Sequence, residues 1–163
     1  MIKTISCTKR KIVLLAIFIV FIARFSTAQS KYINTYKPIA DSLSAVYGIP
    51  ASLMLGIAII ESGAGKSRNC QLLNNHFGIK GKNNLLKTKG IRSAYKQFSD
   101  GRACYVAFSK LVSKRKFYSK LKGNMDYRLW LDALSKSNYS MVPEEWKRNI
   151  TAAIRKHKLA EIN

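Results

Sequence analysis

An almost wholly apolar stretch, residues 50–61, ends in a single acidic residue, Glu61. Proline suits the first turn of a helix and glycine suits its end, so Pro50 and Gly63 bracket a predicted helix. A helix that is apolar on every side is normally buried, which places Glu61 at the inner edge of a core. Loss of water there raises the pKa of a carboxyl group, and a protonated carboxyl can donate a proton to a leaving group. The alternative is a helix-end carboxylate that faces water or pairs with Lys66.

The first 28 residues have the three parts of a secretory signal peptide. Basic residues precede an apolar run at 12–23, and the small residues at 26–28 suit cleavage before Gln29. A membrane span needs about 20 apolar residues, so cleavage is favoured over a stable membrane anchor. The sequence therefore predicts an exported protein, periplasmic or secreted, with a single domain over 29–163.

Residues 29–163 carry 24 basic and eight acidic residues, a net charge of +16. Such a surface attracts nucleic acid, anionic membranes and anionic cell-wall polymers alike, and export argues against nucleic acid. An oxidising compartment permits a disulfide between Cys70 and Cys104, with two buried free thiols as the alternative. The histidines and cysteines lack the spacing of a zinc site, so neither a metal nor a cofactor is predicted. The sequence leaves the oligomeric state open.

Helical periodicity and capping residues predict a mainly α (α+β) domain. The expected helices cover 31–47, the apolar stretch, a segment capped by Ser99 or Asp100, Asp126 to Ser135, and a last segment opened by Pro143. Residues 68–81 are rich in Asn and Gly and are expected to be irregular, and residues 82–98 are expected to form short strands or a hairpin. The expected architecture is a helical domain with a small β-lobe or irregular insertion.

Carbohydrate chemistry fits this pattern. Hydrolysis of a glycosidic bond usually needs one protonated carboxyl group and a second carboxylate. Glu61 suits the first role, but no acid occurs over 62–99, so Asp100 is the next candidate for the second. Aromatic faces that could contact sugars are those of Tyr139, Trp130 and Trp146, and the core is the commoner place for the two tryptophans.

Four blocks of sequence, in order, resemble the bacterial endo-β-N-acetylglucosaminidases that cut peptidoglycan, a family that includes the flagellar rod-type muralytic domain. The blocks are IIESGAGKS, NNHFGIKG, YKQFSDGRACYVAF and DYRLWLDALSKSNYSMVPEEWKRNI, and the resemblance covers residues 31–159. It implies a lysozyme-like fold with a small β-lobe and peptidoglycan glycan strands as the substrate. It also implies cleavage of the β-1,4 bond on the reducing side of N-acetylglucosamine.

The resemblance implies that Glu61 is the catalytic acid and that Tyr139 is the tyrosine of a Gly-Tyr-Ala-like motif, although Asn138 precedes it here. The candidate substrate-binding residues are those of the Asn-x-Phe-Gly-x-Lys loop together with one tryptophan: Asn75, His76, Phe77, Gly78, Lys80 and Trp130. Many members place a second acid in the β-lobe, whereas residues 81–98 contain none. Either the second carboxylate is dispensable, with the substrate's acetamide or a tyrosine-positioned water replacing it, or this chain is weakly active.

Three alternatives remain open at this point. One is a catalytically silent, cationic wall-binding module, which the high positive charge and the missing second acid suggest. Another is muramidase specificity on the same fold. The third is an antimicrobial effector that attacks neighbouring cells.

Overall fold

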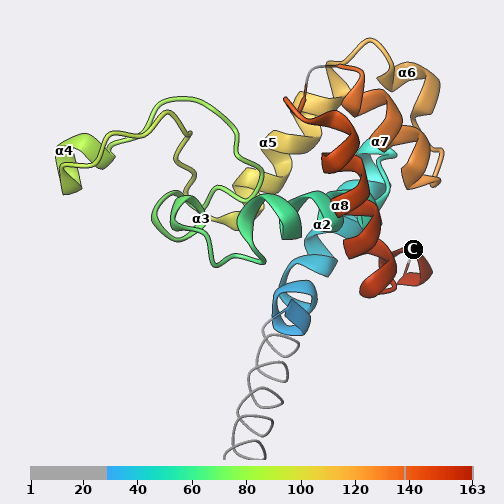
Figure 1. Ribbon diagram of the computed structural model, residues 1–163, viewed down its shortest axis with the longest axis horizontal. Helices are drawn as coiled ribbons and strands as arrows, with labels where there is room; N and C mark the ends of the chain where they lie inside the picture. The colour runs from blue at the N-terminus through green and yellow to red at the C-terminus, as the bar shows by residue number, and fades with distance from the viewer. Residues whose placement is uncertain (1–28, 138, 163) are drawn as a thin grey trace, which may run out of the picture.

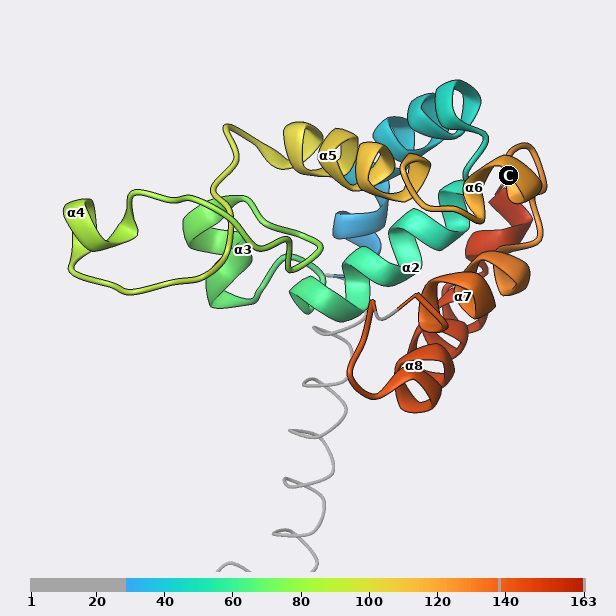
Figure 2. The same cartoon turned by 90° about the horizontal axis from the view of Figure 1, so that it is seen from above.

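A computed structural model describes residues 29–137 and 139–162, so the predicted signal segment 1–28 and Asn138 lie outside the described residues. A body of helices carries one lobe that extends to the side (Figures 1 and 2). The first helix covers 29–47. The others are α2 (Ala51–Ser62), α3 (Arg68–Leu73), α4 (Leu85–Lys89), α5 (Gly101–Ser113), α6 (Tyr118–Leu121), α7 (Tyr127–Ser135), α8 (Pro143–Lys156) and a 3-10 helix, η1 (Leu159–Ile162). The mainly helical fold predicted from the sequence is confirmed.

Helix α2 runs through the centre of the body (Figure 2). Every residue from Ala51 to Ile59 is buried, and the helix packs against α7, α8 and η1. It ends where Gly63 adopts a left-handed conformation with φ 57°, which a residue without Cβ adopts at little cost. The apolar stretch is therefore the core helix that the sequence predicts, and Glu61 lies in its last turn. Within the described ranges, no helix combines the length and hydropathy that a membrane crossing requires.

The predicted caps position the later helices. The Oδ1 atom of Asp100 accepts a 2.7 Å hydrogen bond from the N–H of Ala103 and begins α5. Likewise, Asp126 Oδ1 accepts a 3.0 Å bond from the N–H of Arg128 at the start of α7. Pro143 opens α8, where its missing N–H costs nothing. These three helix starts agree with the sequence prediction.

The prediction of an irregular segment over 68–81 is wrong at its start, because residues 68–73 form α3. The Ser67 hydroxyl oxygen accepts a 3.2 Å bond from the N–H of Cys70, and Asn74 ends the helix with φ 52°. A helix of six residues spans fewer than two turns, which is too short to produce a recognisable periodicity.

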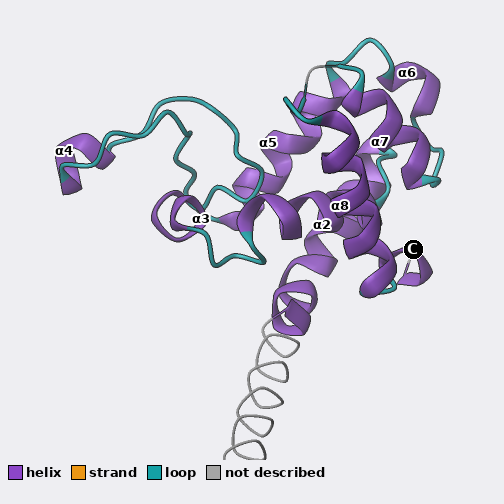
Figure 3. Cartoon of the chain, in the orientation of Figure 1, coloured by secondary structure: helices purple, strands orange, loops and turns teal. Residues whose placement is uncertain are grey.

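Residues 79–97, called the arm below, form the extension that carries α4 at its tip (Figures 1 and 3). The predicted strands reduce here to one isolated antiparallel bridge between Lys80 and Tyr95, so the irregular insertion is the alternative found. A side chain supplements the few backbone bonds across the arm: Asn83 Nδ2 donates to Ser93 O at 2.8 Å and to Tyr95 O at 2.9 Å. The two sides of the arm are therefore held together chiefly by an amide side chain and a few backbone bonds.

Candidate active site

Glu61, in the last turn of α2, lies half-buried between α8 and the loop that follows α3. Its Oε1 atom accepts a 2.8 Å hydrogen bond from Nε1 of Trp146 on α8. On the other side, a Cβ added to Gly78 would lie 3.5 Å from Glu61 Oε2. Burial raises the pKa of Glu61, and the bond from Trp146 partly opposes that rise because it favours the charged form. Such surroundings keep a carboxylic acid protonated to higher pH than in water.

Tyr139 packs against Trp146, whose indole bonds to this carboxyl group. Its hydroxyl donates a 3.3 Å hydrogen bond to the carbonyl of Phe77. Its ring lies 5.2 Å from the ring of Trp146 and meets Phe108 edge-on at 6.2 Å. Burial and the negative charge of Glu61 both raise the pKa of Tyr139. Tyr139 is therefore a neutral hydroxyl group near Glu61, although residues 62–138 lie between them in the sequence.

Two residues of this site were not singled out by sequence analysis. Trp146 was considered only as a core or sugar-stacking residue, and no local pattern could have indicated its bond to a carboxylate on another helix. Tyr95 reaches the site from the arm, because a Cβ on Gly78 would lie 3.8 Å from Tyr95 Cε1. It is the one aromatic residue in 79–97. An aromatic residue alone in a basic segment was the signal that could have found it.

Asn75 is a structural residue, and its predicted role in substrate binding is corrected. Its side chain is buried, and Nδ2 donates 2.8 Å bonds to the carbonyls of Ile79 and Lys96. Oδ1 accepts a 3.0 Å bond from the N–H of Ile79. These three bonds tie the loop after α3 to both ends of the arm, which leaves the amide little capacity for a ligand.

His76 and Phe77 also lie behind the site rather than in it. His76 is 2% exposed, and its Nδ1 lies 2.7 Å from the hydroxyl of Tyr32. Burial lowers the pKa of His76 to about 4. Phe77 is buried and stacks on Phe108 at 4.1 Å. Of the predicted loop residues, Gly78 adjoins Glu61 and Lys80 is exposed on the arm.

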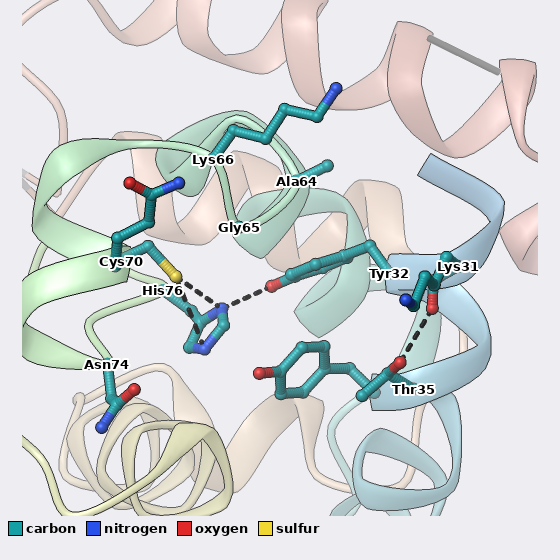
Figure 4. A pocket seen from close by; sticks show the side chains of 11 residues that line it. Lys31, Tyr32, Thr35, Ala64, Gly65, Lys66, Cys70, Asn74 and His76 are labelled. Atoms are coloured by element: carbon teal, nitrogen blue, oxygen red, sulfur yellow. Dashed lines mark hydrogen bonds between the residues drawn. The ribbon is translucent and has the colours of Figure 1, made fainter. Parts of the chain in front are cut away.

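Cys70 and Cys104 are free thiols, so the predicted disulfide is not formed and the alternative holds. Each sulfur contacts His76: Cys70 Sγ lies 3.3 Å from Nδ1, and Cys104 Sγ accepts a 3.3 Å bond from the backbone N–H. Burial raises the pKa of both thiols to about 11. Figure 4 shows Cys70, His76 and Tyr32 together in a pocket of about 440 Å³. Glu61 is not among the residues that line it.

Two further predictions are corrected by burial and capping. Trp130 is fully buried and donates a 2.8 Å bond to the carbonyl of Asn124, so it is a core residue and no sugar platform. Asp100 caps α5, and the next residue, Gly101, lies against Tyr36 and His76 rather than at Glu61. The other described acids that form ion pairs are Asp41, Asp126, Asp132, Glu144 and Glu161.

Comparison with known proteins identifies the family. A family model described as mannosyl-glycoprotein endo-β-N-acetylglucosaminidase matches residues 37–159. No curated protein matches the chain. The catalytic domain of the autolysin Auto from Listeria monocytogenes has a TM-score of 0.69 at 19% identity, with 99% of this chain and 100% of that chain covered.

Two further solved structures share the fold. A C-terminally truncated glycoside hydrolase domain of FlgJ from Salmonella typhimurium has a TM-score of 0.65 at 18% identity, over 80% of this chain and 97% of that chain. A peptidoglycan hydrolase mutant from Sphingomonas sp. A1 has a TM-score of 0.62 at 20% identity, over 82% and 96%. The chain belongs to the endo-β-N-acetylglucosaminidase family of glycoside hydrolases and has its lysozyme-like, mainly helical fold.

Proposed function

We propose that this protein is an exported peptidoglycan hydrolase that uses Glu61 as its general acid. The observation that carries the proposal is the position of Glu61, at the end of a buried helix, with a raised pKa and a hydrogen bond from Trp146. Glycosidic cleavage needs such a protonated carboxyl to deliver a proton to the leaving oxygen. Support for the substrate comes from the similar structures, which include an autolysin and a peptidoglycan hydrolase. The proposed bond is the β-1,4 linkage on the reducing side of N-acetylglucosamine.

The reaction proceeds with a single protein carboxyl group. The candidate for a second carboxylate, Asp100, caps α5 through its Oδ1 atom, which supports a mechanism that uses Glu61 alone. The acetamide oxygen of N-acetylglucosamine attacks C1 while Glu61 protonates the leaving oxygen and the glycosidic bond breaks. Water then attacks C1, the ring formed by the acetamide opens, and the Glu61 carboxylate accepts the proton of that water. Tyr139, a neutral hydroxyl beside Glu61, orients the acetamide.

Export follows from the predicted signal peptide at 1–28 together with the substrate. Peptidoglycan lies outside the cytoplasmic membrane, so a hydrolase that cuts it must cross that membrane. The domain that acts there is residues 29–163, whose net charge of +16 suits an anionic wall. The proposed location is therefore the cell envelope or the medium.

Mass spectrometry of soluble fragments from purified peptidoglycan tests the proposal. The exported protein should release fragments that end in reducing N-acetylglucosamine, and Glu61→Gln should lower the rate by roughly 10² to 10⁴-fold without lowering the unfolding temperature. Glu161→Gln, the same change at an exposed carboxylate in η1, is the matched control and should leave the rate unchanged.

Other results would identify the alternatives. Undiminished release by Glu61→Gln would reject Glu61 as the acid. Fragments ending in reducing N-acetylmuramic acid would assign muramidase specificity. An absence of fragments with wild-type protein that still sediments with the wall would establish a cationic wall-binding module.

A further inference from the structure

The arm is a purely cationic surface. Within 79–97 the charged residues are all basic and all exposed: Lys80, Lys82, Lys87, Lys89, Arg92 and Lys96. No acid occurs anywhere over 62–99. Like charges gathered without counter-charges repel one another, and they attract anions from solution. Charge runs on protein surfaces often serve solubility alone, so the arm needs a second observation before a ligand can be inferred.

The second observation is that the arm is built to hold a fixed shape. Asn83 bonds to both Ser93 and Tyr95 across the arm, and Asn75 bonds to Ile79 and Lys96 at its base. A basic segment that only aids solubility does not need side-chain amides that bridge its two sides. These bonds hold the backbone of the arm, from which the lysine side chains extend, in one arrangement relative to the site.

The third observation is that the arm begins at the site and leads away from it. Gly78, directly before the arm, and Tyr95 within it both approach Glu61. The arm then extends away from the helical body, with α4 at its far end (Figures 1 and 2). Leu85, at the start of α4, lies seven positions after Gly78, so this side of the arm reaches at most about 25 Å from the site.

The geometry points to a ligand on peptidoglycan, the polymer that is also the proposed substrate, so this inference rests on the proposed function. Peptidoglycan strands carry short peptides on alternate sugars, and these peptides leave the strand sideways and bear free carboxylates. We propose that the arm binds the carboxylates of these stem peptides while the glycan lies at Glu61. Lysine ammonium groups on flexible stems suit carboxylates whose positions vary from peptide to peptide.

The exposure of the lysines determines how such binding behaves. A single exposed ion pair contributes little, so several must act together, and salt must weaken the effect. A membrane surface is a less suitable partner, because Leu86 is the one large apolar side chain exposed on the arm. The lysines of the arm are thus expected to raise substrate affinity and to leave the chemical step unchanged.

The experiment compares two substrates that differ only in their peptides. One is a preparation of glycan strands with intact stem peptides and without phosphate-linked polymers, and the other is the same preparation after an amidase has removed the peptides. The triple variant Lys82→Gln, Lys87→Gln, Lys89→Gln should raise KM roughly tenfold on the first substrate and leave kcat unchanged. On the second substrate it should match wild type.

The control carries the same change at three exposed lysines around the end of α5: Lys110→Gln, Lys114→Gln and Lys116→Gln. It should match wild type on both substrates, which separates a specific effect of the arm from the general loss of positive charge. Equal losses for the arm variant on both substrates, or no loss on either, would overturn the proposal. A loss that occurs only with strands that retain phosphate-linked polymers would also overturn it and assign those polymers as the ligand.

Failure of the proposed function would look different. In that case wild-type protein would cut neither substrate, and sedimentation would test the arm independently of catalysis. Reduced binding of the arm variant to peptide-bearing strands alone would then support the arm as a carboxylate-binding surface. Equal binding of wild type and variant to both preparations would overturn it.

Discussion

The indole Nε1 of Trp146 donates a 2.8 Å hydrogen bond to Oε1 of Glu61 and thereby joins α8 to the last turn of α2. The bond favours the ionised carboxylate, whereas burial favours the neutral acid. The protonation state of Glu61 therefore depends on two opposed effects, and only one of them comes from a hydrogen bond that mutation can remove.

Replacing Trp146 with phenylalanine should raise the pKa of Glu61 further. A general acid is active while protonated, so activity falls as pH rises through its pKa, and a higher pKa moves that fall to higher pH. The measurement is kcat/KM against pH for wild type and Trp146→Phe. Trp130→Phe is the control, because Trp130 donates to the Asn124 carbonyl and not to Glu61. The pH at which kcat/KM falls should therefore be the same in Trp130→Phe as in wild type. A shift of the limit to lower pH in Trp146→Phe would contradict this account.

Gly78→Ala should lower activity because the new methyl group enters the site. Its Cβ would lie 3.5 Å from Glu61 Oε2, and its φ of +64° strains any residue other than glycine. Gly90→Ala separates the two effects, since Gly90 has φ +68° and nothing within 4 Å of an added Cβ. Both variants should lose about 1 kcal/mol of stability, and only Gly78→Ala should lose activity. Activity assays and chemical unfolding of the two variants measure these losses. Equal losses of activity in Gly78→Ala and Gly90→Ala would indicate backbone strain as the only cause.

Asn75→Ala should destabilise the fold by about 2 to 4 kcal/mol, because it removes the three hydrogen bonds of a buried amide, two to carbonyl oxygens and one from an N–H. Asn149→Ala, at an exposed position on α8, should change stability by less than about 0.5 kcal/mol. Urea unfolding measures both changes. Similar values for the two variants would show that the amide of Asn75 does not hold the arm to the body.

His76 should make the protein less stable in acid. Its pKa is about 4 when folded and close to 6.5 when unfolded, so the unfolded chain binds the extra proton between these values. Its contribution to stability is thus lost as pH falls from about 6.5 to about 4. The His76→Gln variant has no such group to titrate. The difference between its free energy of unfolding and that of wild type should therefore become smaller as pH falls through this range. A constant difference in urea unfolding from pH 7 to pH 4.5 would show that His76 does not titrate this way.

Four helix starts, those of α2, α5, α7 and α8, were predictable because their signals are local. The apolar run before Glu61, the caps at Asp100 and Asp126, and Pro143 each act within one or two turns. The short helices α3, α4 and α6 were not predicted. The site was only partly predictable, since it depends on contacts between distant segments. A motif match marks Asn75 and Phe77 equally with Gly78, but burial decides which of them reaches Glu61.

The cysteines show the same limit of sequence-based prediction. Their compartment and number allowed a disulfide, yet His76 lies in contact with both sulfurs. The position of a third residue between two others is a property of packing, and no spacing in the sequence encodes it. The arm is similar, because its composition predicted paired strands, whereas one isolated bridge, a few backbone bonds and side-chain amides hold its two sides together.

The use of amides in the arm has a consequence for how this protein can diverge. Asn75 and Asn83 hold the course of the arm through their side-chain amides, while the exposed lysines join these bonds through backbone atoms. Substitutions can therefore replace the outward-facing side chains without changing the fold of the arm. Related proteins that keep the two asparagines could suit walls of different chemistry by changing this surface, with Glu61 and its helix left as they are.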